Sequence, residues 1–372
     1  MSVRVLHVAQ PTVGGVAGYV GRAAADQLAR GWAVAVACPL DGELAGRLGP
    51  DGVPHFPWEA GRSPGVGTLG ETRRLRRIVR EFAPGVVHLH SAKAGLAGRL
   101  APGGPGVIFQ PHGWSWHAGG ALMGAVSRRW ERFAARRCDA LVCCGEGELR
   151  QGVDAGVEGK LALVRNGVDL RRFRPVDRRA ARRALGLDER APLAVCVGRL
   201  TRQKGQDVLL AAWPRVRARC PEARLALVGD GEDLPRLRGL AGPGVTFVPG
   251  TDDPGAWFGA ADVVAVPSRW EGLALVVLEA LASGRSVVAS AIPGLAEAVP
   301  PGAGVLVPAE APAELAGALA VRLSSPALAE VEGRAGAAAS AGFDVEETLD
   351  RLAELTRAVA ERRSAITMNG AQ

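Results

Sequence analysis

The sequence predicts an α/β fold built from two domains that follow one another along the chain. Short apolar segments alternate with segments of helical periodicity, glycines gather where the apolar segments end, and the whole pattern starts again near residue 190. The chain has 372 residues, more than one hydrophobic core usually accommodates. We therefore expect two parallel sheets, each covered by helices on both faces.

The first half opens with a strand, a glycine-rich loop and a helix, which is the start of a βαβ unit. Gly14 and Gly15 stand where the helix begins, a position that binds a phosphate or simply forms the turn. A later strand ends before His112 and Gly113, and open α/β sheets bind ligands at such carboxyl ends. His112 is suited to a hydrogen bond with a sugar hydroxyl; a structural histidine is the alternative. The strands expected in this half are 3–9, 34–38, 86–90, 107–110, 140–144 and 161–164.

The second half repeats the pattern, with a strand at 193–197, the loop Gly198 to Gly205, and a helix. The chain is rich in arginine and has only three lysines, yet Lys204 stands in this loop. Lysine is a compact point charge suited to a phosphate, and Arg199 reaches the same anion. Two such cations would stabilise a departing nucleoside diphosphate without a metal ion; an ordinary surface lysine is the alternative. The other expected strands are 223–228, which ends at Gly229, and 245–249, 262–266, 286–290 and 304–307.

The stretch from Pro267 to Glu279 carries two carboxylates around a glycine. Glu271 and Glu279 are eight positions apart, which on one helix places them near one face, roughly 12 Å apart along the axis. Gly272 lets the backbone approach a ligand closely. An ordinary helix with solvated glutamates is the alternative. The first-turn amides expected to be free for sugar hydroxyls or an anion are those of Leu273, Ala274 and Leu275.

The domain boundaries follow from where the α/β pattern restarts and ends. A polar, arginine-rich stretch after residue 170 separates the two halves. We expect an N-terminal domain over 1–170, a C-terminal domain over 171–345, a closing helix over 346–363 and a disordered polar tail over 364–372.

The composition limits the partners. With 45 lysines and arginines against 38 acidic residues, the net charge is +7, which favours anionic ligands, nucleic acid or an acidic membrane surface. Helix-turn-helix, zinc-finger and RNA-binding patterns are absent, so no nucleic-acid partner is expected. The six cysteines form neither a CxxC pair nor a Cys/His metal spacing, so we expect reduced core thiols and no metal site. No signal peptide or membrane-spanning run is seen, which predicts a cytoplasmic protein.

Two arginine-rich helices are expected at 68–82 and 121–137. On the second, an apolar side is expected that consists of Leu122, Val126, Trp130 and Phe133. The basic faces are either simply solvated or a docking surface for an acidic membrane or an acidic carrier protein.

Taken in order, these motifs resemble those of the retaining glycosyltransferases of family 4, in a bacterial and more narrowly actinobacterial form. The resemblance implies the GT-B fold, in which two Rossmann-like α/β/α domains have a cleft between them. One departure stands out: where the family often has Glu-Gly-Phe-Gly, this chain has Glu271, Gly272, Leu273 and Ala274, which changes the surroundings of the donor sugar. The motifs that carry the resemblance are Gly14-Gly15, His112-Gly113, Asn166-Gly167-Val168-Asp169 with Phe173 and Pro175, Gly198-Arg199-Leu200 with Lys204-Gly205, Gly229-Asp230-Gly231, and Glu271 to Glu279.

The resemblance also implies roles for the residues. Arg199 and Lys204, beside Gly198 and Gly229, would hold the donor diphosphate. Glu279 would bind the ribose hydroxyls. Glu271 and the amides of Leu273, Ala274 and Leu275 after Gly272 would hold the donor sugar, and His112 would contact it near the reacting carbon. Gly14 and Gly15 would border the acceptor and the diphosphate, and the closing helix would cross back to the first domain.

The implied reaction is a metal-independent hexosyl transfer from a nucleotide-sugar, which is a co-substrate rather than a cofactor. The expected donor is a UDP-sugar, with UDP-N-acetylglucosamine as one candidate. The acceptor is expected to be a hydroxyl or amine of a small or carrier-tethered natural-product precursor, as in antibiotic biosynthesis, bound near Trp114, Trp116 and His117. The alternatives are a lipid-linked acceptor at the cytoplasmic membrane face and, in another class, a non-catalytic partner subunit of the same fold.

Overall fold

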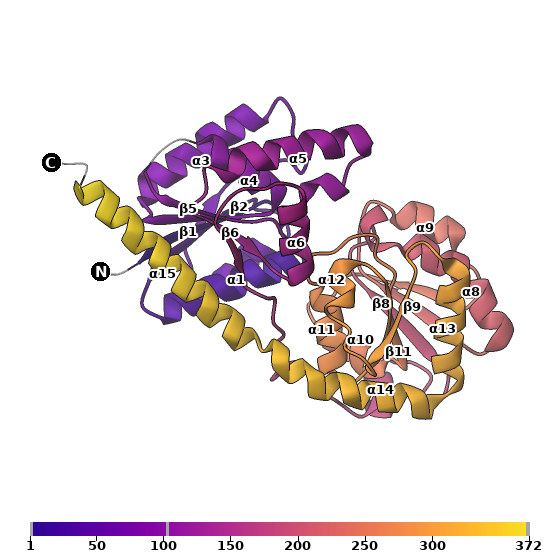
Figure 1. Cartoon of the computed structure of the whole chain (residues 1–372). Helices are drawn as coiled ribbons and strands as arrows, with labels where there is room; N and C mark the ends of the chain where they lie inside the picture. The colour runs from indigo at the N-terminus through magenta and orange to yellow at the C-terminus, as the bar shows by residue number, and fades with distance from the viewer. Residues whose placement is uncertain (1–2, 102–103, 370–372) are drawn as a thin grey trace. The chain divides into compact units, whose positions relative to one another are not determined.

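The computed structural model describes residues 3–101 and 104–369, and the chain forms two compact α/β units that divide between Arg165 and Asn166 (Figure 1). The first unit comprises residues 1–165 together with 348–372, and the second comprises 166–347. These divisions lie close to the boundaries expected from the sequence, near residues 170 and 345.

The first unit is built on a seven-stranded parallel sheet with the order β3-β2-β1-β4-β5-β6-β7. Its strands are β1 (Arg4–Ala9), β2 (Ala33–Cys38), β3 (His55–Pro57), β4 (Val86–His90), β5 (Gly106–Gln110), β6 (Ala140–Cys143) and β7 (Leu161–Leu163). Its helices before the second unit are α1 (Gly14–Ala29), α2 (Glu43–Leu48), α3 (Thr68–Phe82), α4 (Ser91–Leu100), η1 (Ser115–His117), α5 (Ala121–Ala135) and α6 (Glu146–Asp154). Six of these strands match the predicted ones to within a residue at either end, and the short edge strand β3 carried no signal strong enough to predict.

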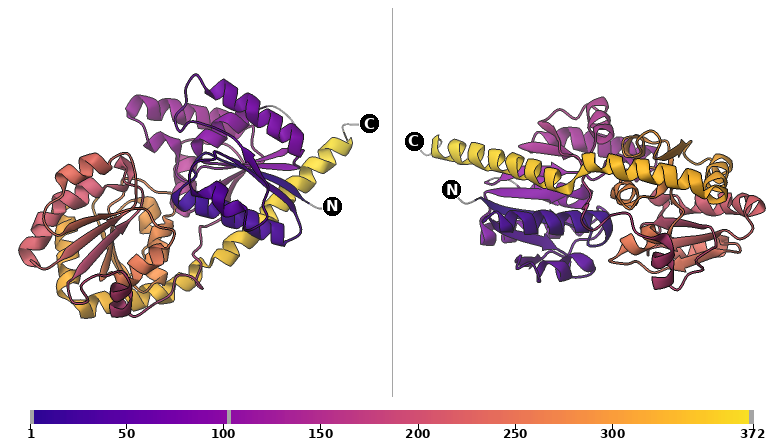
Figure 2. Two further views of the ribbon diagram at one scale, coloured as in Figure 1. Left: turned by 180° about the vertical axis from the view of Figure 1, so that it is seen from behind. Right: turned by 90° about the horizontal axis from the view of Figure 1, so that it is seen from below.

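Each strand of this sheet sends alternate side chains to opposite faces, and both faces are covered. On β1, Val5 and Ala9 pack in the core under α1, while Leu6 and Val8 pack in the core under α3 and α4. Figure 2 shows helices on both faces of each sheet. His7 therefore lies on the α1 face of the sheet, in a position where an apolar residue is usual.

The second unit has a six-stranded parallel sheet with the order β10-β9-β8-β11-β12-β13. Its strands are β8 (Leu193–Val197), β9 (Arg224–Val228), β10 (Val245–Val248), β11 (Val263–Val266), β12 (Ser286–Ser290) and β13 (Gly304–Val307). Its helices are α7 (Arg178–Ala184), η2 (Arg202–Lys204), α8 (Gln206–Arg219), α9 (Leu234–Leu240), α10 (Pro254–Ala260), α11 (Leu275–Ala282), α12 (Pro293–Ala296), α13 (Pro312–Ser324), α14 (Pro326–Ala339) and η3 (Ser340–Phe343). The predicted doubly wound α/β fold is thus present in both units.

The closing helix α15 (Val345–Asn369), yellow in Figure 1, packs as part of the first unit from Thr348 onward. Arg363 pairs with Asp139 there, with Nη2 2.8 Å from Oδ2. The predicted disordered tail is wrong for residues 364–369, which continue the helix; 370–372 lie outside the described residues. No glycine or proline interrupts the sequence before Gly370, so nothing ends the helix earlier. Among the described helices, none has the length and hydropathy of a membrane span.

Helix α5 is turned differently from the prediction. Leu122 and Phe133, expected to pack inward, are 78 % and 52 % exposed, and Val126 is exposed as well. The buried side carries Glu131 instead, whose carboxylate is 2.7 Å from Nη1 of Arg99 on α4, with both side chains almost fully buried. This internal ion pair, which periodicity could not reveal, fixes the rotation of the helix.

The six cysteines are all free thiols, as expected, and only Cys138 is not fully buried. The burial of the other five agrees with the core positions expected for them.

Candidate functional site

In the second unit, the predicted donor-site residues gather at the carboxyl ends of β8 and β11. The chain leaves β8 for β9 on one side, and β11 then pairs with β8 on its other side. This is the point where the strand order reverses, and open parallel sheets bind ligands at such points. Arg199 and Lys204 follow β8, and Glu271 follows β11, so residues far apart in sequence meet at one edge of the sheet.

Lys204 and Glu271 form an ion pair at this edge. Nζ of Lys204 lies 2.6 Å from Oε1 of Glu271, and both side chains are mostly buried. Ser268 donates to the same oxygen of Glu271 at 2.8 Å. The carboxylate thus holds both a cation and a hydroxyl in a partly dry site, where charge-assisted hydrogen bonds are strong.

The close approach of the two loops depends on Gly205. Its φ of +68° is in the left-handed region, and a Cβ at this position would collide with the carbonyl oxygen of Pro267. Glycine here lets the turn after Lys204 lie directly against the loop that carries Glu271. A similar contact occurs at Gly229, where a Cβ would collide with the carbonyl oxygen of Gly198. Close backbone packing at Gly205 and Gly229 therefore holds the loops after β8, β9 and β11 together.

The loop after β8 is held by its own side chains. Nη2 of Arg199 is 3.4 Å from Oε1 of Gln203, and the carbonyl oxygen of Arg199 accepts from Nε2 of Gln206 at 2.9 Å. Nε2 of Gln203 in turn donates to the carbonyl oxygen of Trp270 at 2.9 Å. Arg199 and Lys204 are thereby kept in one loop beside the loop of Glu271.

The helix predicted from Leu273 begins later. Ala274 precedes the first turn of α11 and accepts from the amide of Val277 at 3.1 Å, so Leu273 and Ala274 belong to the loop. Nδ2 of Asn166 donates to the carbonyl oxygen of Leu273 at 2.8 Å, which holds that residue outside the helix. Of the three predicted first-turn amides, Leu275 alone lies in the first turn.

Because of this later start, Glu271 and Glu279 do not share a helix. Glu271 lies in the loop, and its neighbour Gly272 is packed so tightly that a Cβ on Gly294 would collide with the Gly272 carbonyl oxygen. Glu279 lies on α11, half-buried. The expected axial separation along one helix is therefore wrong, because the long-range contacts of Asn166 and Gly294 hold the backbone in an extended loop.

In the first unit, Gly14 and Gly15 begin the sixteen-residue helix α1 directly after the loop that follows β1. Gly14 has a φ of +73°, a conformation that favours glycine. The first amides of a helix have no partner within it and carry the positive end of its dipole. Gly14 and Gly15 therefore stand at the start of a helix, as predicted. A phosphate bound at their amides stays a prediction.

His112 follows β5 in a strained backbone conformation, with φ +53°, and the turn is held by a buried carboxylate. Glu148 accepts from the amide of Gly113 through Oε1 and from the amide of Cys144 through Oε2, the latter at 2.7 Å. Such strain in a non-glycine residue persists only where the surroundings impose it.

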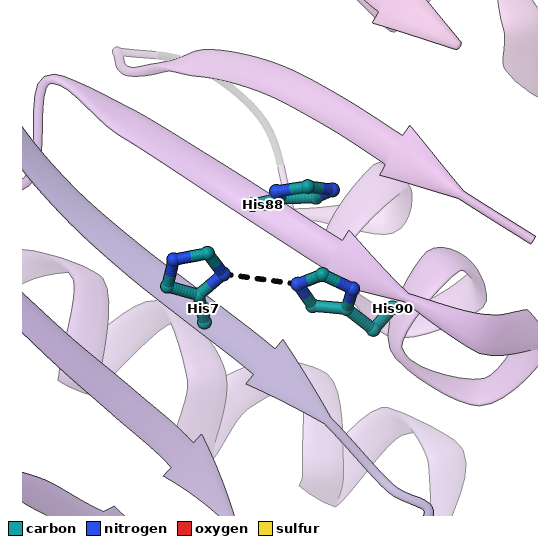
Figure 3. A group of neighbouring side chains, drawn as sticks. All are labelled: His7, His88 and His90. Carbon is teal, nitrogen blue, oxygen red and sulfur yellow. Dashed lines mark hydrogen bonds between the residues drawn. The ribbon is translucent and has the colours of Figure 1, made fainter. Parts of the chain in front are cut away.

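A row of hydrogen bonds runs inward from His112. Its Nε2 is 3.1 Å from Nδ1 of His90; Nε2 of His90 is 2.9 Å from Nδ1 of His7; and Nε2 of His7 is 2.9 Å from Oε1 of Gln27. Figure 3 shows the rings of His7 on β1 and His90 on β4 facing one another, with His88 close by. His7, His88 and His90 are fully buried, whereas His112 is partly exposed.

Burial controls the protonation of these rings. Desolvation lowers the pKa of His7 to about 4, although the hydrogen bond that Gln27 accepts from His7 opposes this shift. Desolvation also holds the pKa of His88 and of His90 well below the ordinary value. The Gln110 amide lies close enough to His88 to oppose its shift, without meeting hydrogen-bonding geometry. The buried imidazoles are therefore neutral near pH 7.

Among the described residues, His7, His88 and His90 are also the group whose ligand atoms lie close enough together, within 4.8 Å, to suggest a metal ion. Nδ1 of His7 and Nε2 of His90 already share a hydrogen bond. The group consists of neutral imidazoles in the interior of the sheet, where a divalent charge is costly. The geometry fits a hydrogen-bonded chain better than a metal centre.

Trp114 and Trp116 do not form the expected acceptor surface. Both are buried in the core under α3 and α4, with parallel rings 4.5 Å apart, and Nε1 of Trp114 donates to the carbonyl oxygen of Glu148. His117 contacts Oε1 of Gln151 at 3.0 Å. The aromatic composition of this segment therefore reflects core packing.

Several site residues had no signal in the sequence. Ser268 and Gln203 contact the predicted residues only through loops that meet in space. The clustering of the histidines on β1 and β4 can be predicted only if the two strands are known to be neighbours, with His7 opposite His88. Only the register of the sheet brings them together.

Two family models match this chain. Residues 13–172 match the model described as glycosyltransferase family 4, and residues 191–325 match the model described as glycosyl transferases group 1. One curated relative, the D-inositol 3-phosphate glycosyltransferase of Kribbella flavida, is 39 % identical over 223 residues, covering 55 % of this chain and 53 % of the relative. The chain thus matches about half the length of such relatives.

Solved structures share the fold along almost the whole chain. The sucrose-phosphate synthase of Thermosynechococcus elongatus has a TM-score of 0.83 at 23 % identity, covering 96 % of this chain and 99 % of that one. The Anabaena protein Alr3699/HepE in complex with UDP and glucose has a TM-score of 0.80 at 20 % identity, covering 95 % and 98 %. These likenesses identify the two-unit architecture as the GT-B fold.

Proposed function

The chain belongs to the bacterial glycosyltransferases of family 4, and from that premise we propose that it moves a sugar from a nucleotide-sugar to a hydroxyl or amine of an acceptor. The observation that carries the proposal is the meeting of Arg199, Lys204 and Glu271 at the strand-order reversal of the second sheet. This edge combines two cations with a carboxylate, which suits a diphosphate linked to a polyol.

In the donor complex, Lys204 exchanges its bond to Glu271 for a bond to the diphosphate, beside Arg199. Glu271, released from the cation, accepts hydrogen bonds from hydroxyls of the donor sugar. Glu279 on α11 takes the ribose hydroxyls, and the amide of Leu275 is a further donor at the start of the helix. The two cations supply the positive charge that the departing diphosphate needs, so the reaction requires no metal ion.

The reaction proceeds with retention in this proposal, by attack of the acceptor on the face that the diphosphate leaves. The bond from the anomeric carbon to the diphosphate oxygen breaks as the bond to the acceptor forms, and the acceptor proton passes to the leaving phosphate oxygen. The protein contributes position and charge stabilisation. His112 contacts the donor sugar near the reacting carbon.

UDP is the first base to test, since the Anabaena structure of the same fold holds UDP and glucose. The acceptor we propose is a small polyol or a carrier-tethered natural-product precursor. The curated relatives named for D-inositol 3-phosphate support a phosphorylated cyclitol as one such acceptor. The amides of Gly14 and Gly15 at the start of α1 suit its phosphate.

The test is a thermal-shift panel with UDP, GDP, ADP and dTDP, each with and without Mg²⁺. A ligand at about a hundred times its Kd adds roughly 2.7 kcal/mol of stability, which a melting curve resolves. A shift with one nucleotide, equal with and without Mg²⁺ and reduced in Lys204→Met, is the expected result. No shift with any nucleotide would favour a non-catalytic partner subunit.

A second candidate acceptor is favoured by the surface of α5. Leu122, Met123, Val126 and Phe133 are exposed there, and Arg128, Arg129, Arg132 and Arg136 are exposed on the same helix. Exposed apolar side chains flanked by arginines suit the surface of an anionic membrane, so a lipid-linked acceptor is the alternative.

Vesicle flotation separates the two acceptors. If the acceptor is lipid-linked, the protein should float with phosphatidylglycerol-containing vesicles and not with pure phosphatidylcholine, and the double variant Leu122→Ser, Phe133→Ser should stay in solution. Val321→Ser on α13 is the matched control, because Val321 is an exposed apolar residue outside this surface. If the wild type does not float with either kind of vesicle, the lipid-linked acceptor is refuted and the soluble acceptor is the one retained.

A further inference from the structure

The chain of hydrogen bonds from Gln27 through His7 and His90 to His112 has one direction along its whole length. A neutral imidazole has one nitrogen that donates and one that accepts. Each histidine of the chain uses its Nε2 toward the Gln27 end and its Nδ1 toward the His112 end. Once one proton is placed, every other proton in the chain is therefore placed as well.

The Gln27 side chain sets this direction. Its Oε1 faces Nε2 of His7, and an amide oxygen only accepts. His7 must then carry its proton on Nε2, which leaves Nδ1 of His7 to accept from Nε2 of His90. By the same step, Nδ1 of His90 accepts from Nε2 of His112, and Nδ1 of His112 is left without a proton.

We propose that His7 and His90 are positioning residues that hold His112 in the Nε2–H tautomer, so that its Nδ1 meets the donor sugar as a hydrogen-bond acceptor. The inference rests on the proposed function for the group that His112 contacts. The tautomer itself follows from the hydrogen bonds within the first unit.

Two further contacts fix the ring of His112. The left-handed backbone at this residue is held by the bond between the Gly113 amide and Glu148. The rings of Tyr19 and His112 form a T-shaped contact, with centroids 5.1 Å apart. The backbone and Nε2 of His112 are thus both held by contacts within the first unit, and the residue as a whole is partly exposed.

Burial keeps the chain neutral, which the tautomer argument needs. His7 and His90 are fully buried, and desolvation lowers the pKa of each. A protonated imidazole has two donors and would break the series at whichever ring carried the extra proton.

His88 provides a matched control for the chain. It is as buried as His7 and His90 on the same face of the sheet, and its ring stacks on His90 with centroids 4.0 Å apart. Within the described residues, neither of its nitrogens meets hydrogen-bonding geometry. His88→Phe therefore changes the packing of this region while leaving the hydrogen-bonded chain intact, whereas His7→Phe removes two of its bonds.

The first measurement is the tautomer of each histidine, from long-range ¹H–¹⁵N spectra of protein labelled with ¹⁵N-histidine at pH 7.5. The expected result is that His7, His90 and His112 are neutral and all protonated on Nε2. In His7→Phe, His112 should become a mixture of tautomers, whereas His88→Phe should leave it unchanged. A His112 tautomer that differs from that of His90, or that does not respond to His7→Phe, would overturn the proposal.

The same spectra recorded with added Zn²⁺ test for metal binding. Loss of the signals of the Nε2-protonated tautomers of His7 and His90 at one equivalent of Zn²⁺ would also overturn the proposal.

The second measurement is the steady-state release of UDP from UDP-glucose. His7→Phe should lower kcat by roughly tenfold or more with little change in KM, a smaller loss than the ~10⁴-fold seen where a general base is left in the wrong tautomer. His88→Phe should leave both within about twofold, and equal losses in the two variants would assign the effect to packing and overturn the proposal. If His7→Phe does not fold, Gln27→Met takes its place, since it removes only the terminal acceptor. A wild type without activity toward any nucleotide-sugar would contradict the proposed function, and the spectra would still decide the tautomer.

Discussion

Nζ of Lys204 lies 2.6 Å from Oε1 of Glu271, so the cation assigned to the donor diphosphate is paired with the carboxylate assigned to the donor sugar. The pair is mostly buried and Ser268 shares the same oxygen. The two groups hold each other in place, and a donor that carries both a diphosphate and hydroxyls offers each a new partner at once. UDP alone offers a new partner only to Lys204 and leaves Glu271 without its cation.

This competition gives the first prediction, for Glu271→Gln. Removing the carboxylate frees Lys204, so UDP should bind more tightly, by about 1.4 kcal/mol or roughly tenfold. The rate of sugar transfer or donor hydrolysis should nevertheless fall by roughly 10- to 100-fold, the cost of a lost charged hydrogen bond. Calorimetry with UDP and a UDP-release assay measure the two effects.

The matched variant is Lys204→Met, which removes the other partner. It should weaken UDP binding by roughly 1.5–3 kcal/mol while leaving uridine binding unchanged, because only the diphosphate contacts the lysine. If Glu271→Gln weakened UDP as much as Lys204→Met does, the exchange of partners would be refuted.

A second prediction concerns the glycine at which the two loops meet. Gly205→Ala should cost more stability than Gly186→Ala, although both have a similar positive φ, +68° and +66°. At Gly186 a Cβ meets open space, so only the backbone penalty of about 1–2 kcal/mol applies. At Gly205 the Cβ collides with the Pro267 carbonyl, which displaces Lys204 and should also weaken UDP binding. Urea denaturation and calorimetry check both, and equal stability losses would show that the loops can separate freely.

A third prediction concerns the buried pair of Arg99 and Glu131. Glu131→Gln should lower the free energy of unfolding by roughly 3–5 kcal/mol, because it leaves Arg99 charged and buried without its partner. The control is Glu189→Gln, since the pair of Glu189 with Arg183 is exposed and should matter little. Chemical denaturation measures both; a small effect of Glu131→Gln would mean that water reaches Arg99.

A fourth prediction is a loss of stability on mild acidification. The pKa of His7 is lowered to about 4 in the folded protein, whereas an unfolded histidine titrates near its ordinary value of about 6.5. Between these values the unfolded state binds more protons, so the free energy of unfolding falls as the pH falls. His7 alone should contribute a loss of about 2 kcal/mol between pH 7.5 and 5, since 1.4 kcal/mol corresponds to each unit.

The measurement is the difference between wild type and His7→Phe in urea denaturation at several pH values, which cancels the titration of the carboxylates. The slope with pH should be shallower in the variant. Burial also lowers the pKa of His112, to about 3, but His112 is partly exposed as a residue, whereas His7 is fully buried, so His7 is the ring chosen for substitution. Parallel pH profiles of His7→Phe and wild type would contradict the prediction.

Much of the fold could be predicted because strands, turns and helices each have a pattern that extends over only a few residues of the sequence. Apolar strands followed by glycines, twice over, specify two parallel sheets, and twelve of the thirteen strands follow that pattern closely. Residues that follow strand ends, such as His112, Arg199 and Lys204, could also be chosen as candidate site residues from the sequence. The reason is that open parallel sheets bind ligands at the carboxyl ends of their strands. The edge strand β3 has only three residues and too little pattern to be recognised.

The errors arose where a distant contact overrode a local pattern. The spacing of Glu271 and Glu279 suits a helix, but Asn166 holds the Leu273 carbonyl and Gly294 packs against Gly272, so the helix starts at Leu275. The apolar stripe of α5 suits an inward face, but the pairing of Glu131 with Arg99 turns it outward.

The sequence by itself determined the two-sheet architecture, the order of the motifs and the side chains offered at each strand end, because periodicity and turn chemistry act over a few residues. The tertiary structure alone decided which of those side chains meet. The ion pair of Lys204 with Glu271 and the chain from Gln27 to His112 depend on the order of parallel strands, which places residues far apart in sequence side by side, and on close backbone contacts that no local pattern encodes.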